Sequence, residues 1–315
     1  MKSLCVFVAL LVHCIAALAE RPPDASPARF TVKVVDEDGK PLADTSISAA
    51  FVTEEPPLSG ATDVDGFFVA SCRKAMLSNA GFTVNKAGCY EAHGGCTFAK
   101  IVGGRWEPWN PVVTAVVRRV VNPIPMYARM VATMLPATNA SCGYDFEIGD
   151  WVAPHGVGKQ SDVFLRVNRS VLSREDFDLT LQVTFTNSSD GLHTVTPISV
   201  SAFKSPRRAP TDGYKTSYER NMGRKPHTGF FNTDLLAAEY CVFRVRTVLD
   251  EDGRIKSTHY GKITSGFKVV GYLAEKVTIK FTYYLNPTPN DRNLEFDPKR
   301  NLFTHLGEFE GVYEP

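Results

Sequence analysis

Two tryptophans stand three positions apart in the segment Trp106-Glu-Pro-Trp109-Asn-Pro111. Flat indole rings stack on the C–H faces of sugars, and rigid prolines reduce the entropy lost when such a platform binds a ligand. The same segment is also typical of a structural clamp over the edge of a β-sandwich, which is the more ordinary outcome. Trp151, in Asp150-Trp-Val-Ala-Pro154, allows the same two interpretations. We therefore treat these three tryptophans as candidate glycan-binding residues.

A second group of candidates lies in residues 204–226, which contain seven lysines and arginines and almost no aliphatic side chains. Arg207, Arg208 and Tyr214 in this segment could grip an acidic polysaccharide, although a solvated loop is the ordinary alternative. The whole chain balances 35 Lys and Arg against 34 Asp and Glu, so no charge excess favours nucleic acid. We predict a long loop here and no nucleic-acid partner.

Acid–base chemistry needs paired carboxyl groups, and Glu295 and Asp297 stand two positions apart. A glycosidase places two such groups across the scissile bond, but pairing with nearby cations on a charged surface segment is the simpler interpretation. The other closely spaced acids are expected to be solvated turn residues: Asp145, Glu147, Asp150, Asp162, Asp176 and Asp178. The sequence contains no H-E-x-x-H, H-x-H or G-x-S-x-G motif. We predict no catalytic residue, no metal site and no cofactor.

The first residues have the form of a secretory signal peptide. Lys2 supplies a positive charge, residues 4–18 are apolar apart from His13, and Ala17-Leu18-Ala19 is a small-x-small cleavage sequence. A bilayer span needs roughly 20 apolar residues, which is more than this run provides. The pattern predicts that residues 1–19 are removed, that the mature chain begins at Glu20, and that the protein is secreted or periplasmic without a transmembrane segment.

Cleavage would leave five cysteines where disulfides can persist: Cys72, Cys89, Cys96, Cys142 and Cys241. Proximity favours a bridge between Cys89 and Cys96, because Gly94-Gly95 could let the chain reverse between them. Cys142 and Cys241 are the further disulfide candidates, but the number is odd and the connectivity stays open. Free thiols, or a metal cluster that includes His93, are the alternatives for the segment 89–96.

Short β-rich runs separated by turn residues fill residues 29–121 and predict a sandwich. Within them, "VKVVDEDGKPLADTSISAAF" followed by "SGATDVDGFFVAS" resembles the carboxypeptidase regulatory-like domain, which is a transthyretin-like β-sandwich. The resemblance covers about a third of the chain. It rests on D-x-x-G-x-P-L and T-D-x-x-G-x-F turns whose residues here are Asp36, Gly39, Pro41, Leu42, Thr62, Asp63, Gly66 and Phe68. It implies a non-catalytic accessory or interaction module, and no catalytic residues.

The rest of the chain predicts a second, mostly antiparallel β-domain. Two prolines in residues 121–125 indicate the junction, so we expect an N-terminal linker at 20–28, a first domain at 29–121, a linker at 122–141 and a second domain at 142–315. Asp250-Glu-Asp-Gly253 between two β-runs indicates a hairpin. Residues 232–239 predict the one short helix, and the proline-rich tail after Tyr284 predicts an extended strap. The fold class is all-β.

These patterns together favour an exported, non-catalytic binding or assembly protein whose partner is a glycan or another surface protein. The alternatives are a secreted carbohydrate-processing enzyme and a purely structural envelope component. An exposed face formed by Trp106 and Trp109 would favour glycan binding, whereas two carboxylates in a deep cleft would favour the enzyme.

Overall fold

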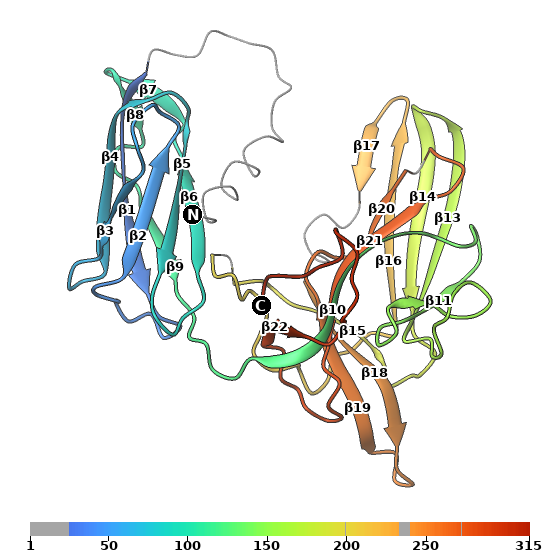
Figure 1. The fold of residues 1–315 in the computed structure, drawn as a ribbon. Helices are drawn as coiled ribbons and strands as arrows, with labels where there is room; N and C mark the ends of the chain where they lie inside the picture. Colours follow the sequence, from blue (N-terminus) through green and yellow to red (C-terminus); the bar gives the residue numbers. More distant parts are fainter. Residues whose placement is uncertain (1–24, 199, 233–239, 272) are drawn as a thin grey trace. The chain divides into compact units, whose positions relative to one another are not determined.

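The computed structural model describes residues 25–315 apart from 199, 233–239 and 272, and the chain divides into two compact units, Met1–Val117 and Arg118–Pro315 (Figure 1). Every regular element in the described part of the chain is a β-strand, so the protein is all-β. Within these residues no helix is long and apolar enough to cross a bilayer. The expected signal peptide, residues 1–19, lies outside the described residues.

The first unit contains a three-stranded and a four-stranded sheet, whose inner faces form its core, and a separate two-stranded sheet. The strands of one sheet run in the order β4 (Phe67–Ala75), β1 (Ser26–Val35), β9 (Val112–Val116). The strands of the second sheet run in the order β3 (Leu58–Ala61), β2 (Ser46–Phe51), β5 (Asn79–Asn85), β6 (Ala92–Thr97). Separately, β7 (Lys100–Val102) pairs with β8 (Arg105–Glu107). Alternate residues of β1, including Phe30 and Val32, are fully buried, as expected for strands with one face on a core. Phe82 of β5 packs against Phe30, with ring centroids 6.3 Å apart.

Aspartate–glycine turns end or begin several strands, and the sequence predicted them from local chemistry. In Asp36–Gly39 the Asp36 carboxylate accepts the backbone N–H groups of Asp38 and Lys40, and Gly39 takes φ +79°. The turn at Asp250 repeats this pattern, with Gly253 at φ +75°. Glycine is favoured at such positions because a Cβ is strained at positive φ. The predicted hairpin is confirmed, because this turn joins β18 (Cys241–Leu249) to β19 (Ile255–Ile263).

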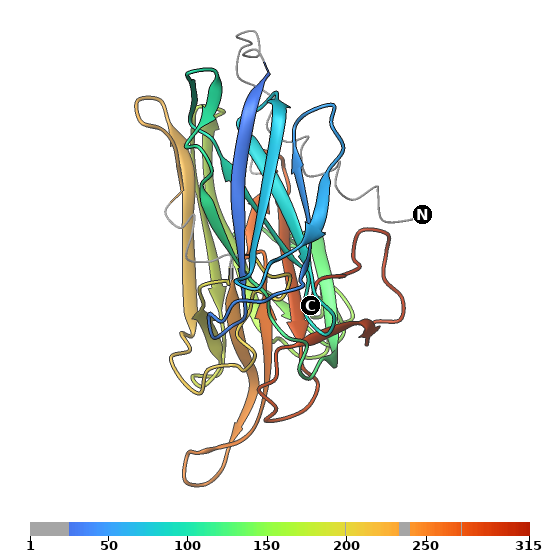
Figure 2. The same cartoon turned by 90° about the vertical axis from the view of Figure 1, so that its left-hand side faces the viewer.

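The second unit is a larger sandwich, from which the β18–β19 hairpin projects in both views (Figures 1 and 2). One sheet, called here the β21 sheet, has the order β15 (Gly191–Thr194), β18, β19, β21 (Thr278–Leu285), β10 (Ile124–Met134), β22 (Phe296–Asn301), with β20 (Lys268–Val270) also on β21. The facing sheet has the order β12 (Asp150–Trp151), β11 (Cys142–Asp145), β13 (Val163–Ser173), β14 (Asp176–Thr184), β16 (Ser217–Lys225), β17 (Gly229–Asn232). Aromatic rings from both sheets, such as Tyr144 and Phe281 at 5.5 Å, fill the space between them.

The outer face of the β21 sheet is covered by the unit's own loops and tail. Phe296 and Val312 of the tail pack on Met126 and Tyr284. Ala209 of the loop before β16 packs on Val242, Tyr260 and Leu294. The expected C-terminal strap is therefore present as an extended segment that contributes one short strand, β22.

Two expectations about boundaries need correction, and a third lies almost entirely outside the described residues. Residues 122–141, expected to be a linker, hold β10, an inner strand that pairs with both β21 and β22, and the second unit begins at Arg118. The long loop expected at 204–226 ends at Ser217, because β16 continues to Lys225 with Met222 packed on the core. The helix expected at 232–239 falls almost entirely outside the described residues.

None of the described cysteines is in a disulfide, so the expected bridge between Cys89 and Cys96 is not formed. The chain reverses before Cys89, whose N–H donates to the carbonyl oxygen of Lys86 at 3.1 Å. From Ala92 onward β6 is extended, which carries Cys96 about 13 Å along the strand at ~3.3 Å per residue. Cys142 and Cys241 are buried in the core of the second unit, and burial raises the pKa of the Cys241 thiol to about 12.

Candidate functional site

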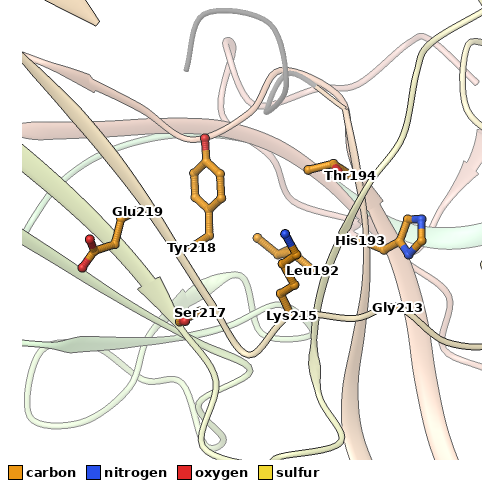
Figure 3. Close-up of a pocket in the computed structure, with 8 residues that line it drawn as sticks. All are labelled: Leu192, His193, Thr194, Gly213, Lys215, Ser217, Tyr218 and Glu219. Carbon is orange, nitrogen blue, oxygen red and sulfur yellow. The ribbon is translucent and has the colours of Figure 1, made fainter. Parts of the chain in front are cut away.

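A pocket of about 490 Å³ opens where the edge strand β15 meets the start of β16. We call it the β15–β16 pocket, and its lining residues are Leu192, His193, Thr194, Gly213, Lys215, Ser217, Tyr218 and Glu219 (Figure 3). The residues come from one strand of each sheet and from the loop between them. The pocket therefore depends on how the two sheets of the sandwich are held together at this edge.

Backbone pairing between Leu192 and Lys215 fixes the floor of the β15–β16 pocket. The Leu192 N–H donates to the Lys215 oxygen at 3.0 Å, and the Lys215 N–H returns a bond of 2.8 Å. The approach is so close that a Cβ at Gly191 would lie 2.4 Å from the Lys215 oxygen. Glycine at this position is thus a geometric requirement of the site.

The pocket offers hydrogen-bonding groups of several kinds. His193 Nδ1 lies 3.2 Å from the carbonyl oxygen of Asp212, and the Glu219 carboxylate accepts a bond of 2.6 Å from Gln182 Nε2. The exposed ammonium group of Lys215 makes no hydrogen bond or ion pair within the described chain. Tyr218 is half-buried, with its ring packed against the core. An unengaged ammonium beside an aromatic ring suits a ligand rich in hydroxyl groups.

Figure 3 shows Glu219 and His193 at opposite ends of the pocket, with Tyr218, Leu192 and Lys215 between them. A carboxylate and an imidazole that exchange a proton with one substrate must both reach it within hydrogen-bond distance. Their separation instead suits contacts spread along an extended ligand. The arrangement thus favours binding over proton transfer.

A second pocket, of about 310 Å³, gathers two of the residues predicted from the sequence. We call it the Arg207–Arg208 pocket, and it is lined by Val121, Asn122, Arg207, Arg208, Asp291, Asn293 and Glu295. Buried Glu295 accepts the N–H groups of Val121 and Asn122 at 2.8 and 2.9 Å and contacts Arg207 at 3.3 Å. Asp297 pairs with Arg300 at 2.6 Å. These two acids are thus held by separate sets of partners.

Trp106 and Trp109 do not form one exposed face. Trp106 is buried and donates its indole N–H to the Ala75 oxygen at 3.1 Å, so it is the structural clamp that the sequence allowed as the alternative. Trp109 is 37% exposed, but the Arg105 guanidinium lies 5.1 Å from its ring. Trp151 lies in the core of the second unit. One tryptophan of the three is therefore accessible to a ligand.

Tyr214 anchors the loop that joins the two pockets. Its hydroxyl donates to the Pro210 oxygen at 2.9 Å, and the Arg244 guanidinium stacks 4.5 Å from its ring. The ring also lies edge-on to His193, with centroids 5.9 Å apart. Tyr214 therefore positions the β15–β16 pocket from behind and does not line it.

Sequence reasoning missed a buried ion network, because its acids were expected to be solvated. Arg246 Nε and Nη2 bond Asp162 and Asp145 at 2.7 and 2.9 Å, and Nη1 contacts Glu147. Burial by itself lowers the pKa of Arg246, but the bond to Asp162 raises it above its ordinary value. Arg246 has φ +59° inside a β-bulge, which no local motif revealed. Among the residues described, no group of three or more His, Cys, Asp or Glu is arranged to hold a metal.

No protein-family model and no curated protein matches the chain. A 3-chlorocatechol 1,2-dioxygenase from Rhodococcus opacus 1CP is 14% identical, with a TM-score of 0.24. The match covers 32% of this chain and 63% of the dioxygenase chain, which is less than two thirds of its length. A DUF3823 family protein from Parabacteroides merdae ATCC 43184 is 9% identical over 87% of this chain and 100% of its own, with a TM-score of 0.23. The shaft pilin SpaA from Lactobacillus rhamnosus GG is 12% identical over 66% of this chain and 98% of its own, with a TM-score of 0.22. Likenesses of this size assign neither a family nor a function.

Proposed function

We propose that this chain is an exported, non-catalytic binding protein whose second unit binds a glycan in the β15–β16 pocket. The observation that carries the proposal is the pocket itself, which places an ammonium, an imidazole, hydroxyls, a carboxylate and a tyrosine ring around about 490 Å³. Sugars present alternating donor and acceptor hydroxyls around apolar C–H faces. This lining supplies partners for both.

Export is part of the proposal and rests on the sequence of residues 1–19. The mature protein is expected to begin at Glu20. N-terminal sequencing of exported material checks this, and a chain that retained Met1 would contradict it.

The first unit is proposed to be an accessory module of the carboxypeptidase regulatory-like kind. Its support is the pair of aspartate–glycine turns that carry the resemblance. Asp63 accepts the N–H groups of Asp65 and Phe67, and Gly66 has φ +77°, which repeats the geometry of the turn at Asp36. Removal of this unit is expected to leave glycan binding by the second unit intact.

The test is a glycan array on the mature protein, followed by calorimetry with the best ligand. Lys215→Ala should weaken binding at least about tenfold, because it removes the ammonium that no protein group engages, a charged hydrogen bond being worth ~1.5–3 kcal/mol. Lys256 is also exposed and lies on β19, so Lys256→Ala is the matched control and should bind as the wild type does.

Two results would contradict the proposal. The first is an array without a saturable ligand, and the second is equal binding by the wild type and Lys215→Ala. Chemical turnover of a bound glycan would replace the binding function with the enzymatic alternative.

A further inference from the structure

Three cationic side chains surround the ring of Phe203 in the second unit. The guanidinium carbons of Arg118 and Arg207 lie 4.3 and 5.6 Å from the ring centroid, and Lys262 Nζ lies 4.9 Å from it. Arg118 and Phe203 are both buried, and Arg118 Nη1 donates to the carbonyl oxygens of Phe203 and Ser205 at 2.7 Å. Like charges at this spacing repel one another, and a ring quadrupole offsets only part of that cost.

Within the described chain, Lys262 is the cation of this cluster that makes no ion pair or hydrogen bond. Lys262 is 1% exposed, and no described residue makes a hydrogen bond to its ammonium nitrogen. Its close neighbours are the faces of Phe203 and Tyr284, the latter at 4.5 Å. Burial, together with the charge of Arg118, lowers the pKa of Lys262 to about 7, against opposing effects of Glu295 and Glu314. A buried amine without a partner is costly unless a counter-charge reaches it.

Two carboxylates near the cluster are already engaged. Glu295 accepts two backbone N–H groups and forms an ion pair with Arg207 at 3.3 Å, and Asp291 accepts bonds from Asn286 Nδ2 and the Asn293 N–H. Arg208 is exposed on the wall of the Arg207–Arg208 pocket and has no side-chain partner in the described chain. Arg118, Lys262, Arg207 and Arg208 thus lie near two acids, Glu295 and Asp291, whose lone pairs are already partly used, and near the exposed Glu314.

We propose that the Arg207–Arg208 pocket binds an oxyanion, namely the carboxylate, sulfate or phosphate group of a small molecule or of an acidic sugar. Guanidinium groups bond such anions in a bidentate manner, and the volume of about 310 Å³ admits the anion with part of a carrier. Arg208 is the direct contact. Lys262 and Arg118 do not line the pocket; they share the Phe203 ring with Arg207 and act through their charge. The site is independent of the β15–β16 pocket, so either proposal can fail alone.

The test is calorimetry on the mature protein with two probes, inorganic sulfate and a galacturonic acid oligomer, in chloride of constant ionic strength. Saturable binding is expected, and Arg208→Ala should weaken it at least about tenfold. Arg254→Ala, an exposed arginine on the β18–β19 hairpin, and Lys215→Ala should both leave it unchanged. Binding of both probes assigns the site to the oxyanion itself, whereas binding of the oligomer alone assigns it to an acidic sugar.

The absence of saturable binding by either probe would overturn the proposal, as would binding that Arg208→Ala does not change. A second measurement tests the role of Lys262. An anion near the cluster should raise the pKa of Lys262, so binding at pH 7.5 should take up protons in the wild type and not in Lys262→Met. Equal uptake by both proteins would remove Lys262 from the site.

Discussion

Two cations in the second unit, half-buried Arg246 and buried Lys262, have opposite environments. Arg246 has three carboxylates around its guanidinium, and these raise its pKa. Lys262 has aromatic faces and no hydrogen bond, and its pKa falls. In the first arrangement the carboxylates of the facing sheet and its turns neutralise the Arg246 charge. In the second arrangement the Lys262 ammonium must either lose its proton or be neutralised by an anion that binds nearby.

Lys262 should therefore make the stability of the second unit depend on pH. Its pKa is 10.5 when unperturbed and about 7 in the folded chain. Between these values the unfolded chain holds a proton that the folded chain has released, so the free energy of unfolding should rise with pH by up to ~1.4 kcal/mol per unit. Below pH 7 both states are protonated and this contribution is constant. Lys262→Met should remove the rise.

The measurement is urea unfolding between pH 6.5 and 8.5, with Lys256→Met as the exposed control. The range stops there because buried thiols such as Cys241 act in the opposite direction once thiols of the unfolded chain begin to ionise. Identical pH slopes for the wild type and Lys262→Met would contradict the account.

At the scale of elements, the pairing of β5 with β6 places the Phe82 ring directly against Gly94. Gly94 pairs with Phe82, and an added Cβ at Gly94 would meet the Phe82 ring at 2.3 Å. Phe82 is 1% exposed, so its ring has nowhere to move. Gly81 lies on the neighbouring strand β5. A Cβ added there would lie 3.7 Å from the nearest atom, the Gly94 oxygen, which is ordinary van der Waals contact.

Gly94→Ala should thus destabilise the first unit by about 1–3 kcal/mol, as overpacking of a filled core does. Gly81→Ala should be neutral or slightly stabilising, by about 0.5 kcal/mol, because alanine loses less backbone entropy in a strand. Thermal unfolding of the two variants beside the wild type provides the comparison. Equal melting temperatures for both variants would contradict the close contact between Gly94 and the Phe82 ring.

At the scale of the molecule, the chain passes from one unit to the other at residues 117–118. Arg119, Val120 and Val121 are exposed, whereas Arg129 lies inside β10 with its guanidinium bonded to Gly149 and Glu310. Proteases cut exposed chain that can leave its hydrogen bonds, and they spare inner strands.

Limited trypsin digestion should consequently cut after Arg119 well before it cuts after Arg129. Mass spectrometry of the early fragments should find one that begins at Val120. Equally rapid cleavage after Arg129 would restore the linker that the sequence had predicted at 122–141.

The sequence by itself determined the features that depend on a few neighbouring residues. The strands of the β18–β19 hairpin follow from β-rich runs around Asp250–Gly253, where one carboxylate and one glycine complete the turn within five positions. The all-β class and the extended tail follow from the same local chemistry. Such features are readable because the hydrogen bonds that fix them begin and end inside the segment.

Only the tertiary structure decided which charged side chains meet. Arg118, Arg207 and Lys262 gather on Phe203 from segments far apart in the chain, and Asp162 reaches Arg246 across 84 positions. It also decided that Trp106 is buried while Trp109 is exposed, because the β7–β8 hairpin carries one ring to Ala75. The type of each side chain determines how strong these contacts can be. Which side chains become buried and which lie close together is decided when whole sheets pack, so no local sequence pattern predicts it.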